Sequence, residues 1–128
     1  MNKHILIIDD EEVIRDLLAR CLANRSYRIT AVATAAEAIR VVEREAPDLV
    51  ISDLQLEDAD GLEMIAEIKR IVPAVPVILL TGVLFDPQVV KEILRQHVSR
   101  YLNKTAPLAQ ILETVQELLP DSGPEGAS

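Results

Sequence analysis

The sequence predicts an α/β fold in which five helices cover a doubly wound, five-stranded parallel sheet. Short apolar runs that do not alternate with polar residues indicate parallel strands buried on both faces. Segments with apolar residues every three or four positions lie between these runs and indicate amphipathic helices. The strand-then-helix order occurs five times in 128 residues, which is the length of one ordinary domain.

Five strands are expected from the apolar runs. The strongest candidates are residues 5–8, 49–51 and 75–80, and residues 27–32 and 100–103 are weaker. Strands of an open parallel sheet are joined by helices that lie on its two faces. The sequence therefore needs a helix after each of these five segments.

The helices are expected where apolar residues recur with helical spacing. The first helix has the clearest stripe, formed by Val13, Ile14, Leu17, Leu18, Cys21 and Leu22. The five helices are expected at residues 11–24, 35–45, 62–72, from 86–87 onward, and 108–118. Pro107 suits the first turn of the last helix. We assign residues 1–119 to one domain and 120–128, which lack apolar anchors, to a disordered tail or the start of a linker.

The composition excludes several function classes. Thirteen Lys and Arg against 21 Asp and Glu give a net charge of −8, which disfavours binding to nucleic acid and to anionic membranes. Aromatic residues make up 2% of the chain, too few for base-stacking platforms. The single cysteine, Cys21, excludes a disulfide framework and is expected in the core. No apolar run reaches the length of a membrane span, and we expect a cytoplasmic location.

Polar residues follow four of the expected strands. Asp9 and Asp10 follow the first, Asp53 the third, Thr81 the fourth and Lys104 the fifth. Because ligands of open α/β sheets bind beyond the carboxyl ends of the strands, these side chains are expected to converge at one edge. Three carboxylates in one pocket repel each other, and a bound cation relieves that repulsion. The ligands are all oxygens, so a hard cation fits, and Mg²⁺ suits a few carboxylates with retained waters.

The same group of residues suggests phosphoryl transfer. An aspartate can act as a nucleophile and form an aspartyl phosphate. A lysine and a metal ion neutralise charge on the transferring phosphoryl group, and a threonine hydroxyl can hold one of its oxygens. The sequence therefore predicts a phosphoacceptor site at this edge of the sheet.

The set Asp9-Asp10, Asp53, Thr81 and 101–104 resembles the receiver domain of two-component response regulators. The resemblance covers residues 3–119 and implies a flavodoxin-like, receiver-like fold. It also implies that Asp53 is the phosphorylated residue, with Thr81 and Lys104 assisting the transfer. Thr81 and Tyr101 resemble the residues that link phosphorylation to a change of surface.

The resemblance implies a metal site as well. Asp10 and Asp53 resemble direct Mg²⁺ ligands, Asp9 resembles an acid that acts largely through water, and the backbone carbonyl of Gln55 resembles a further ligand. A metal-dependent phosphohydrolase on a similar sheet is the rival enzyme. It would need an acid two residues beyond the nucleophile, where this chain has Gln55.

The resemblance also implies partners. The donor is a histidine kinase or a histidine phosphotransfer protein, and the downstream effector is unknown. A homodimer through the surface of the fourth helix, fifth strand and fifth helix is one implied arrangement. The domain is expected to be a signalling domain rather than an enzyme, although it assists its own phosphoryl transfer and dephosphorylation.

Two residues depart from the family pattern. Thr105 follows the lysine where the family usually has a proline, often after a cis bond; a cis bond here would cost about 3 kcal/mol, so we expect a trans or a strained loop. Glu57 stands where proline is common and adds negative charge near the pocket mouth. Both support one alternative, a receiver-like protein-interaction module that does not use phosphorylation.

Several residues have ordinary structural interpretations. His4 begins a strand at the end opposite the pocket, and His97 ends the fourth expected helix. Both are expected to be structural or exposed. Leu84 and Phe85 lie in the loop after Thr81, and burial is favoured over a partner contact.

Overall fold

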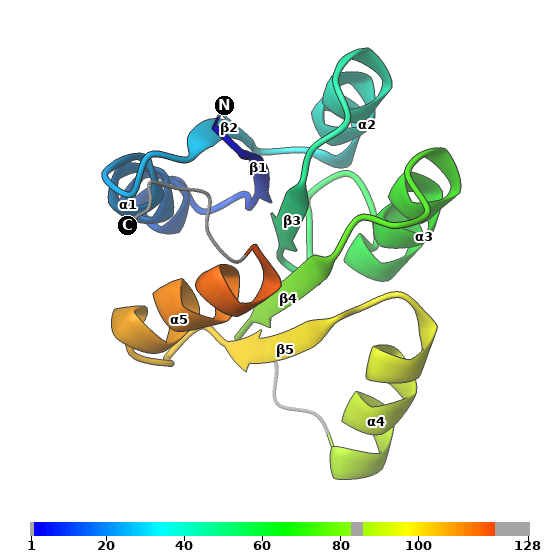
Figure 1. Ribbon diagram of the computed structural model, residues 1–128. Coiled ribbons are helices and arrows are strands. Elements are labelled where there is room, and N and C mark those ends of the chain that lie inside the picture. Colours follow the sequence, from blue (N-terminus) through cyan, green and yellow to red (C-terminus); the bar gives the residue numbers. More distant parts are fainter. Residues whose placement is uncertain (1, 83–85, 120–128) are drawn as a thin grey trace.

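The computed structural model describes residues 2–82 and 86–119, and it contains the expected five strands and five helices (Figure 1). In chain order they are β1 (His4–Ile8), α1 (Glu12–Ala23), β2 (Arg28–Val32), α2 (Ala35–Arg44), β3 (Leu49–Ser52), α3 (Gly61–Ile71), β4 (Val77–Thr81), α4 (Pro87–Gln96), β5 (Arg100–Asn103) and α5 (Leu108–Leu118). The α/β prediction is therefore confirmed, and most bounds agree within two residues.

All five strands are parallel and form one sheet in the order β2-β1-β3-β4-β5. Helices α1 and α5 lie on one face, and α2, α3 and α4 lie on the other (Figure 1). The strand order reverses next to β1, where the crevice of a doubly wound sheet forms. The residues that follow β1 and β3 are therefore placed side by side at that crevice.

Successive residues of the central strands pack on opposite faces of the sheet. In β1, Ile5 and Ile7 contact the α1 and α5 side, and Leu6 and Ile8 contact the side of α2, α3 and α4. All four are 0% exposed. Because both faces are covered, all four of these positions are apolar, which explains why the run does not alternate.

Side-chain caps begin three of the helices. Thr34 accepts a hydrogen bond from the Glu37 amide at 3.2 Å and begins α2. Asp60 accepts from the Leu62 amide at 2.7 Å and begins α3. Asp86 caps α4 in the same way, before Pro87. Each cap satisfies a backbone N–H that has no partner inside its helix.

Two details differ from the prediction, the start of β4 and the position of Pro107, and both involve a proline. Strand β4 begins at Val77 rather than at residue 75, because Pro76 has no N–H to contribute to the sheet. Pro107 is the residue before the first turn of α5, not a member of that turn. It keeps an extended ψ of 142° there, outside the helical range.

The apolar stripe of α1 is wider than its buried face. Leu18 and Leu22 are buried as predicted, but Val13 is 78% exposed and Leu17 is 46% exposed. Cys21 is only half-buried, so its predicted place in the core is wrong. Helical spacing therefore identified the helix but overestimated how many of its apolar residues the sheet covers.

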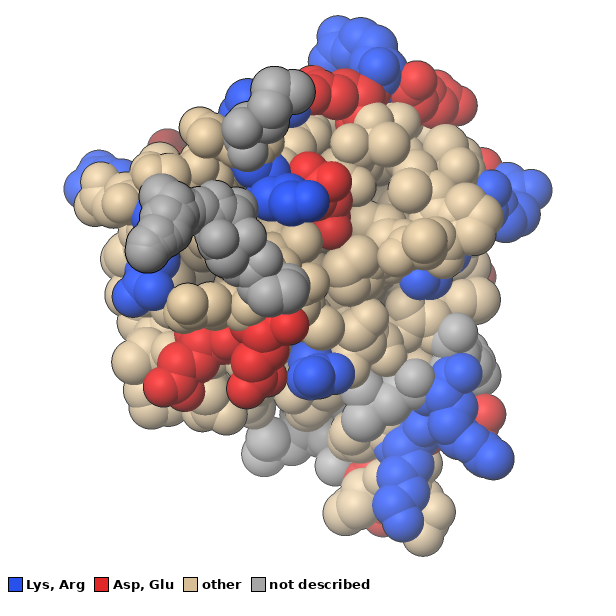
Figure 2. Space-filling view, in the orientation of Figure 1, with Lys and Arg blue, Asp and Glu red and all other residues tan. Residues whose placement is uncertain are grey.

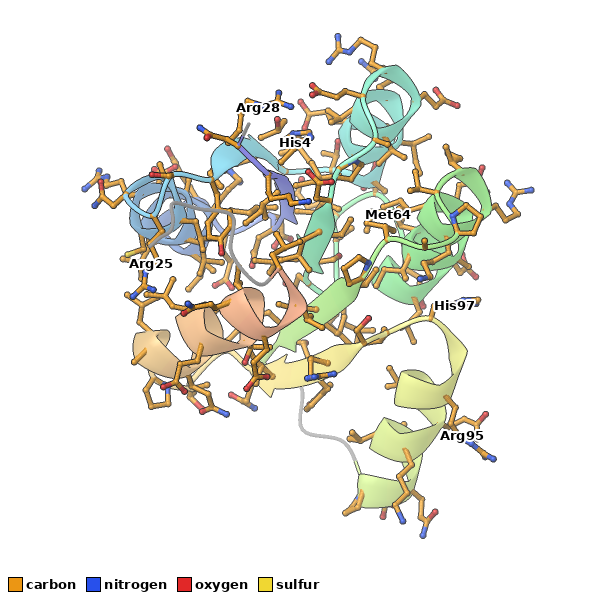
Figure 3. The ribbon with its side chains drawn as sticks, in the orientation of Figure 1. His4, Arg25, Arg28, Met64, Arg95 and His97 are labelled. Atoms are coloured by element: carbon orange, nitrogen blue, oxygen red, sulfur yellow. The ribbon has the colours of Figure 1, made fainter. Side chains whose placement is uncertain are left out.

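The two histidines lie apart from each other, and one is buried while the other is exposed (Figure 3). His4 is 2% exposed, and its Nε2 lies 2.8 Å from the Thr30 hydroxyl. His97 is the exposed residue that ends α4. Neither lines the pocket described below.

The expectations for Leu84-Phe85 and for the tail at 120–128 fall outside the described residues. Within the described residues, no helix combines the length and the apolar character that a membrane span needs.

On the face seen in Figure 2, basic side chains gather over α4 and acidic side chains over the region of α5.

Candidate functional site

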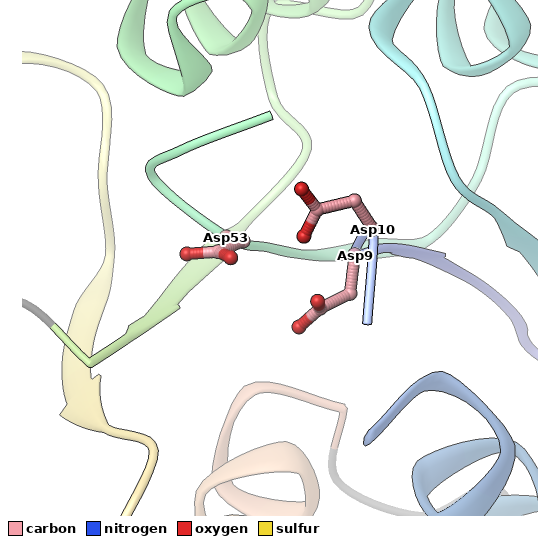
Figure 4. A group of neighbouring side chains, drawn as sticks. All are labelled: Asp9, Asp10 and Asp53. Carbon is pink, nitrogen blue, oxygen red and sulfur yellow. The ribbon is translucent and has the colours of Figure 1, made fainter. Parts of the chain in front are cut away.

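Three aspartates meet at the carboxyl edge of the sheet (Figure 4). Asp9 and Asp10 follow β1, and Asp53 follows β3, whose neighbour in the sheet is β1. The Asp53 amide donates to the Ile8 carbonyl at 3.0 Å, which holds the two strand ends together. One carboxylate oxygen from each aspartate lies within 4.8 Å of the other two. Asp9 and Asp53 are 2% and 6% exposed, and Asp10 is exposed.

Lys104 brings a positive charge to these acids from the end of β5. Its Nζ lies 2.9 Å from Asp53 Oδ2 and 3.1 Å from Asp9 Oδ2, and it also pairs with Glu11. The Lys104 amide donates to the Thr81 carbonyl at 2.9 Å, so the end of β4 holds the start of the loop that follows β5. The Lys104 side chain is 13% exposed.

Thr105, in the usual place of proline, does not displace the lysine. The described residues contain no cis peptide bond, so the loop is trans, one of the two predicted outcomes. The Thr105 amide and hydroxyl both donate to Asn103 Oδ1, at 2.8 and 2.7 Å. These bonds close a tight turn that directs Lys104 into the site.

Burial and charge pairing have opposite effects on the pKa values of Asp9 and Lys104. Burial raises the pKa of the Asp9 carboxyl above its ordinary value, although the Glu11 amide and Lys104 partly offset this. Burial by itself lowers the pKa of the Lys104 ammonium, but hydrogen bonds to Glu11, Asp53 and Asp9 outweigh it, and the net pKa is raised. Lys104 therefore stays charged, and its charge offsets the electrostatic cost of burying the aspartates.

The loop after β3 orients the Asp53 carboxylate. Its Oδ1 accepts hydrogen bonds from the amides of Leu54 at 2.6 Å and Gln55 at 3.4 Å. Its Oδ2 faces Lys104. The two oxygens are thus held differently, one by the backbone and one by a side chain.

The same loop is tied to α2 and α3. Asp58 accepts hydrogen bonds from the amides of Ala35 and Ala36 at 2.9 and 3.2 Å, at the beginning of α2. These bonds lower the pKa of the Asp58 carboxyl. At the other end of the loop, the Gly61 amide donates to the Leu54 carbonyl at 2.7 Å. The position of the loop therefore depends on two helices.

Gly61 allows the close approach of α3 to the carboxyl end of β3. A Cβ at this position would lie 2.4 Å from the Asp53 carbonyl oxygen and 2.5 Å from that of Leu54. Gly61→Ala is expected to lower the free energy of unfolding by about 2 kcal/mol, because the backbone must shift to remove this overlap. Urea denaturation followed by circular dichroism measures the change.

Gly82→Ala is the matched control, because no described atom lies within 4 Å of its ideal Cβ. Alanine is the better helix former, so helix propensity alone would make Gly61→Ala stabilising. Equal or greater stability of Gly61→Ala than of the wild type would contradict the steric role of Gly61.

A pocket of about 310 Å³ opens beside Asp53. Its walls are Asp10, Glu11, Asp53, Gln55, Thr81, Gly82 and Lys104. Thr81 ends β4 and is 1% exposed. All the residues predicted to hold metal or phosphate, apart from the more deeply buried Asp9, therefore line one cavity.

Tyr101 lies away from this cavity. It is half-buried on β5 and packs against the cluster under α2, α3 and α4. Burial raises the pKa of its phenol. Its position on the side of α4 is compatible with the predicted link to that surface.

The extra negative charge at the pocket mouth comes from Glu11 rather than from Glu57. Glu57 is exposed and does not line the pocket. Glu11 lines it and pairs with Lys104, yet the sequence analysis did not single it out. The sequence feature that could have identified Glu11 is its position directly after Asp9-Asp10, at the same strand end.

The acids suit a hard divalent cation. Asp9, Asp10 and Asp53 offer three carboxylate oxygens close together, and Gln55 lies on the wall of the same pocket. Carboxylate and carbonyl oxygens are the ligands of Mg²⁺ and Ca²⁺, and no Cys or His is among them to favour a softer metal. The donor set therefore fits the predicted metal.

Comparison with known proteins supports the resemblance seen in the sequence. The family model of the response regulator receiver domain matches residues 5–116. The transcriptional regulatory protein GlrR of Escherichia coli K12 is 34% identical over 121 residues, which are 94% of this chain and 27% of GlrR. The response regulator protein VraR of Staphylococcus aureus Mu3 is 32% identical over 119 residues, which are 91% of this chain and 56% of VraR.

A solved structure agrees with these relatives. The crystal structure of a CheY-like response regulator receiver domain protein from Methanospirillum hungatei JF-1 matches with a TM-score of 0.86 and 28% identity, over 94% of this chain and 95% of that chain. The chain spans 27% of the length of GlrR and 56% of that of VraR, so the match concerns one part of those proteins. With nearly every described residue inside the matched region, the chain belongs to the family of response regulator receiver domains.

Proposed function

We propose that this domain accepts a phosphoryl group on Asp53 from a phosphohistidine partner in a Mg²⁺-dependent reaction, and that the modification switches a protein-interaction surface. The observation that carries the proposal is the contact of Lys104 Nζ with Asp53 Oδ2 at 2.9 Å, beside two further aspartates. A structural ion pair has no need of two more acids at one edge of the sheet, where they repel each other.

The reaction is a nucleophilic displacement at phosphorus. An oxygen of the Asp53 carboxylate attacks the phosphorus, and the bond from phosphorus to the donor nitrogen breaks, with its electron pair left on the histidine. Lys104 donates a hydrogen bond to a phosphoryl oxygen and neutralises part of its charge. The Thr81 hydroxyl, at the pocket wall, donates to another phosphoryl oxygen.

Asp9, Asp10, Asp53 and the Gln55 carbonyl would hold the metal. When bound there, Mg²⁺ neutralises charge on the acids and on the phosphoryl oxygens. Asp10 is exposed and lines the pocket, which suits a direct ligand. Asp9 is more deeply buried and bonds to the Glu11 amide at 2.8 Å, which suits a residue that acts through water.

The output follows from the movement of Thr81 toward the phosphoryl group. Thr81 and Tyr101 lie on neighbouring strands, and Tyr101 faces the side on which α4 packs. A shift of Thr81 therefore leaves space that Tyr101 can enter, which changes the surface of α4, β5 and α5. This surface is the proposed contact for a downstream effector or for a second copy of the domain. The domain works as a signalling element that assists its own phosphorylation and dephosphorylation.

Intact-mass spectrometry after incubation with acetyl phosphate tests the function. With Mg²⁺ we expect an adduct with the mass of one phosphoryl group, and with EDTA in its place we expect the adduct to fall to a small fraction. A phosphohistidine-bearing kinase fragment should give the same adduct in the same metal-dependent way.

Two results would count against the proposal. Labelling that does not depend on Mg²⁺ would remove the metal from the reaction. Absence of any adduct, from a protein shown to be folded by circular dichroism, would favour the alternative of an interaction module that does not use phosphorylation.

A further inference from the structure

The ammonium of Lys104 has three acidic partners, and one of them has no role in the proposed function. Asp9 lies 3.1 Å away and Asp53 lies 2.9 Å away. The third partner is Glu11, the residue just before α1. An ammonium group has three N–H donors, so these three acids occupy all of them.

We propose that Glu11 is a positioning residue that slows phosphorylation, because it holds Lys104 at the pocket mouth and competes with the phosphoryl group for its ammonium. This inference rests on the proposed function of Asp53. It adds that Glu11, which is not among the proposed metal and phosphate ligands, limits the rate of phosphorylation.

The competition follows from the number of donors. A phosphoryl oxygen can bond to Lys104 only if one of the three acids leaves. The side chains of Asp9 and Asp53 are only 3% and 8% exposed, and each is also held by a backbone amide, so both are expensive to displace. Glu11 is 59% exposed in its side chain, and water can replace its contact. Glu11 is therefore the partner that gives way, and its hold on Lys104 must be broken at each transfer.

Charge adds to this effect. Glu11 lines the pocket, so its carboxylate faces the path of an incoming phosphoryl group. Like charges repel each other, and water and salt weaken the repulsion at an exposed site. Even a screened charge at this place is expected to slow the approach of a dianionic donor severalfold.

The side chain of Glu11 can be changed with little effect on the fold. Its amide donates to Asp9 Oδ1 at 2.8 Å, and its carbonyl accepts from the Arg15 amide at 3.0 Å. Both are backbone groups, and the Glu11 side chain does not cap α1. Glutamine at this position keeps the length and the backbone bonds but removes the charge.

The test compares Glu11→Gln with Glu12→Gln. Glu12 is the next residue, exposed in the first turn of α1, and it does not line the pocket. With acetyl phosphate and saturating Mg²⁺, we expect Glu11→Gln to be phosphorylated about tenfold faster than the wild type. Glu12→Gln should remain within about twofold of the wild type, because an exposed charge farther from the path is screened by water and salt.

Two further measurements separate the electrostatic role from a structural one. The gain in Glu11→Gln should shrink as NaCl is raised, because salt screens the charge that was removed. It should also be smaller with phosphoramidate, a donor with less negative charge at neutral pH. In each case acetate or ammonia leaves with the electron pair of the bond to phosphorus, so the chemistry at Asp53 is the same.

The outcomes separate this inference from the proposed function. If the wild type is labelled but Glu11→Gln is no faster than Glu12→Gln, the role of Glu11 is wrong and the function of Asp53 stands. A slower Glu11→Gln would mean that Glu11 assists Lys104 rather than restraining it. If neither the wild type nor the variants are labelled, the proposed function itself fails.

Discussion

Asp53→Asn is expected to abolish phosphoryl labelling by acetyl phosphate while the protein remains folded. The amide has no nucleophilic carboxylate, so the aspartyl phosphate cannot form. Its carbonyl oxygen can still accept the hydrogen bonds that Leu54 and Gln55 donate to Oδ1. Intact-mass spectrometry measures the loss, and thermal unfolding by circular dichroism verifies the fold.

The strand that carries Asp53 also offers a matched control. Asp48 precedes β3 and Asp53 follows it, so the two aspartates lie at opposite ends of one strand. Asp48→Asn removes the same charge far from the pocket and should be labelled at the wild-type rate. Labelling of Asp53→Asn at that rate would place the acceptor elsewhere, and peptide mapping would locate it.

Lys104→Met is expected to lower the free energy of unfolding by about 3 kcal/mol in buffer without divalent ions. The two acids that pair with Lys104 have side chains only 3% and 8% exposed. Removal of the ammonium leaves these charges buried without compensation, and that is the costly way to break a buried ion pair. Lys91→Met is the control, because Lys91 is exposed on α4. Urea denaturation gives both values.

The pH dependence of the same variant has a definite sign. Burial raises the pKa of Asp9 and Lys104 lowers it, so loss of Lys104 raises that pKa further. A carboxyl whose pKa is higher in the folded state destabilises the fold as pH rises through the interval between its unfolded and folded values. The stability deficit of Lys104→Met should therefore be largest at neutral pH and shrink as acidification protonates Asp9. A deficit that grows on acidification would contradict this account.

Addition of Mg²⁺ should restore part of the stability that Lys104→Met loses. A cation that binds only the folded state stabilises it by mass action. In the variant it would also supply the positive charge that the acids lack. A variant whose urea midpoint does not change with Mg²⁺ would argue against metal binding by these aspartates.

The sequence could predict the fold because burial constrains the central strands so strongly. Residues 5–8 are apolar throughout because each faces one of two covered sides of the sheet. The sequence could not predict in the same way how many apolar residues of a helix the sheet would cover. Val13 fits the helical stripe of α1, yet it lies beyond the reach of the sheet and is 78% exposed. Spacing along a helix does not report how wide the neighbouring surface is.

The site residues were predictable because the end of each parallel strand lies at one edge. Asp9, Asp53 and Lys104 could therefore be placed together from their positions after apolar runs. Glu11 could not, because nothing in the spacing says which of the exposed acids near the pocket a flexible lysine will reach. Glu57 was the acid expected at the mouth, but the tie of its neighbour Asp58 to α2 fixes that part of the loop outside the pocket.

The sequence distance between Lys104 and Asp9 affects how the chain is made. The two residues that pair are 95 positions apart. During translation the three aspartates leave the ribosome long before the lysine that stabilises them. Until β5 adds to the edge of the sheet, the growing chain carries uncompensated negative charge at the proposed phosphorylation site. We therefore expect a product that ends before Lys104 to be less stable and not to be phosphorylated. Under the proposed function, we expect competence for phosphorylation to report that synthesis has passed the last strand.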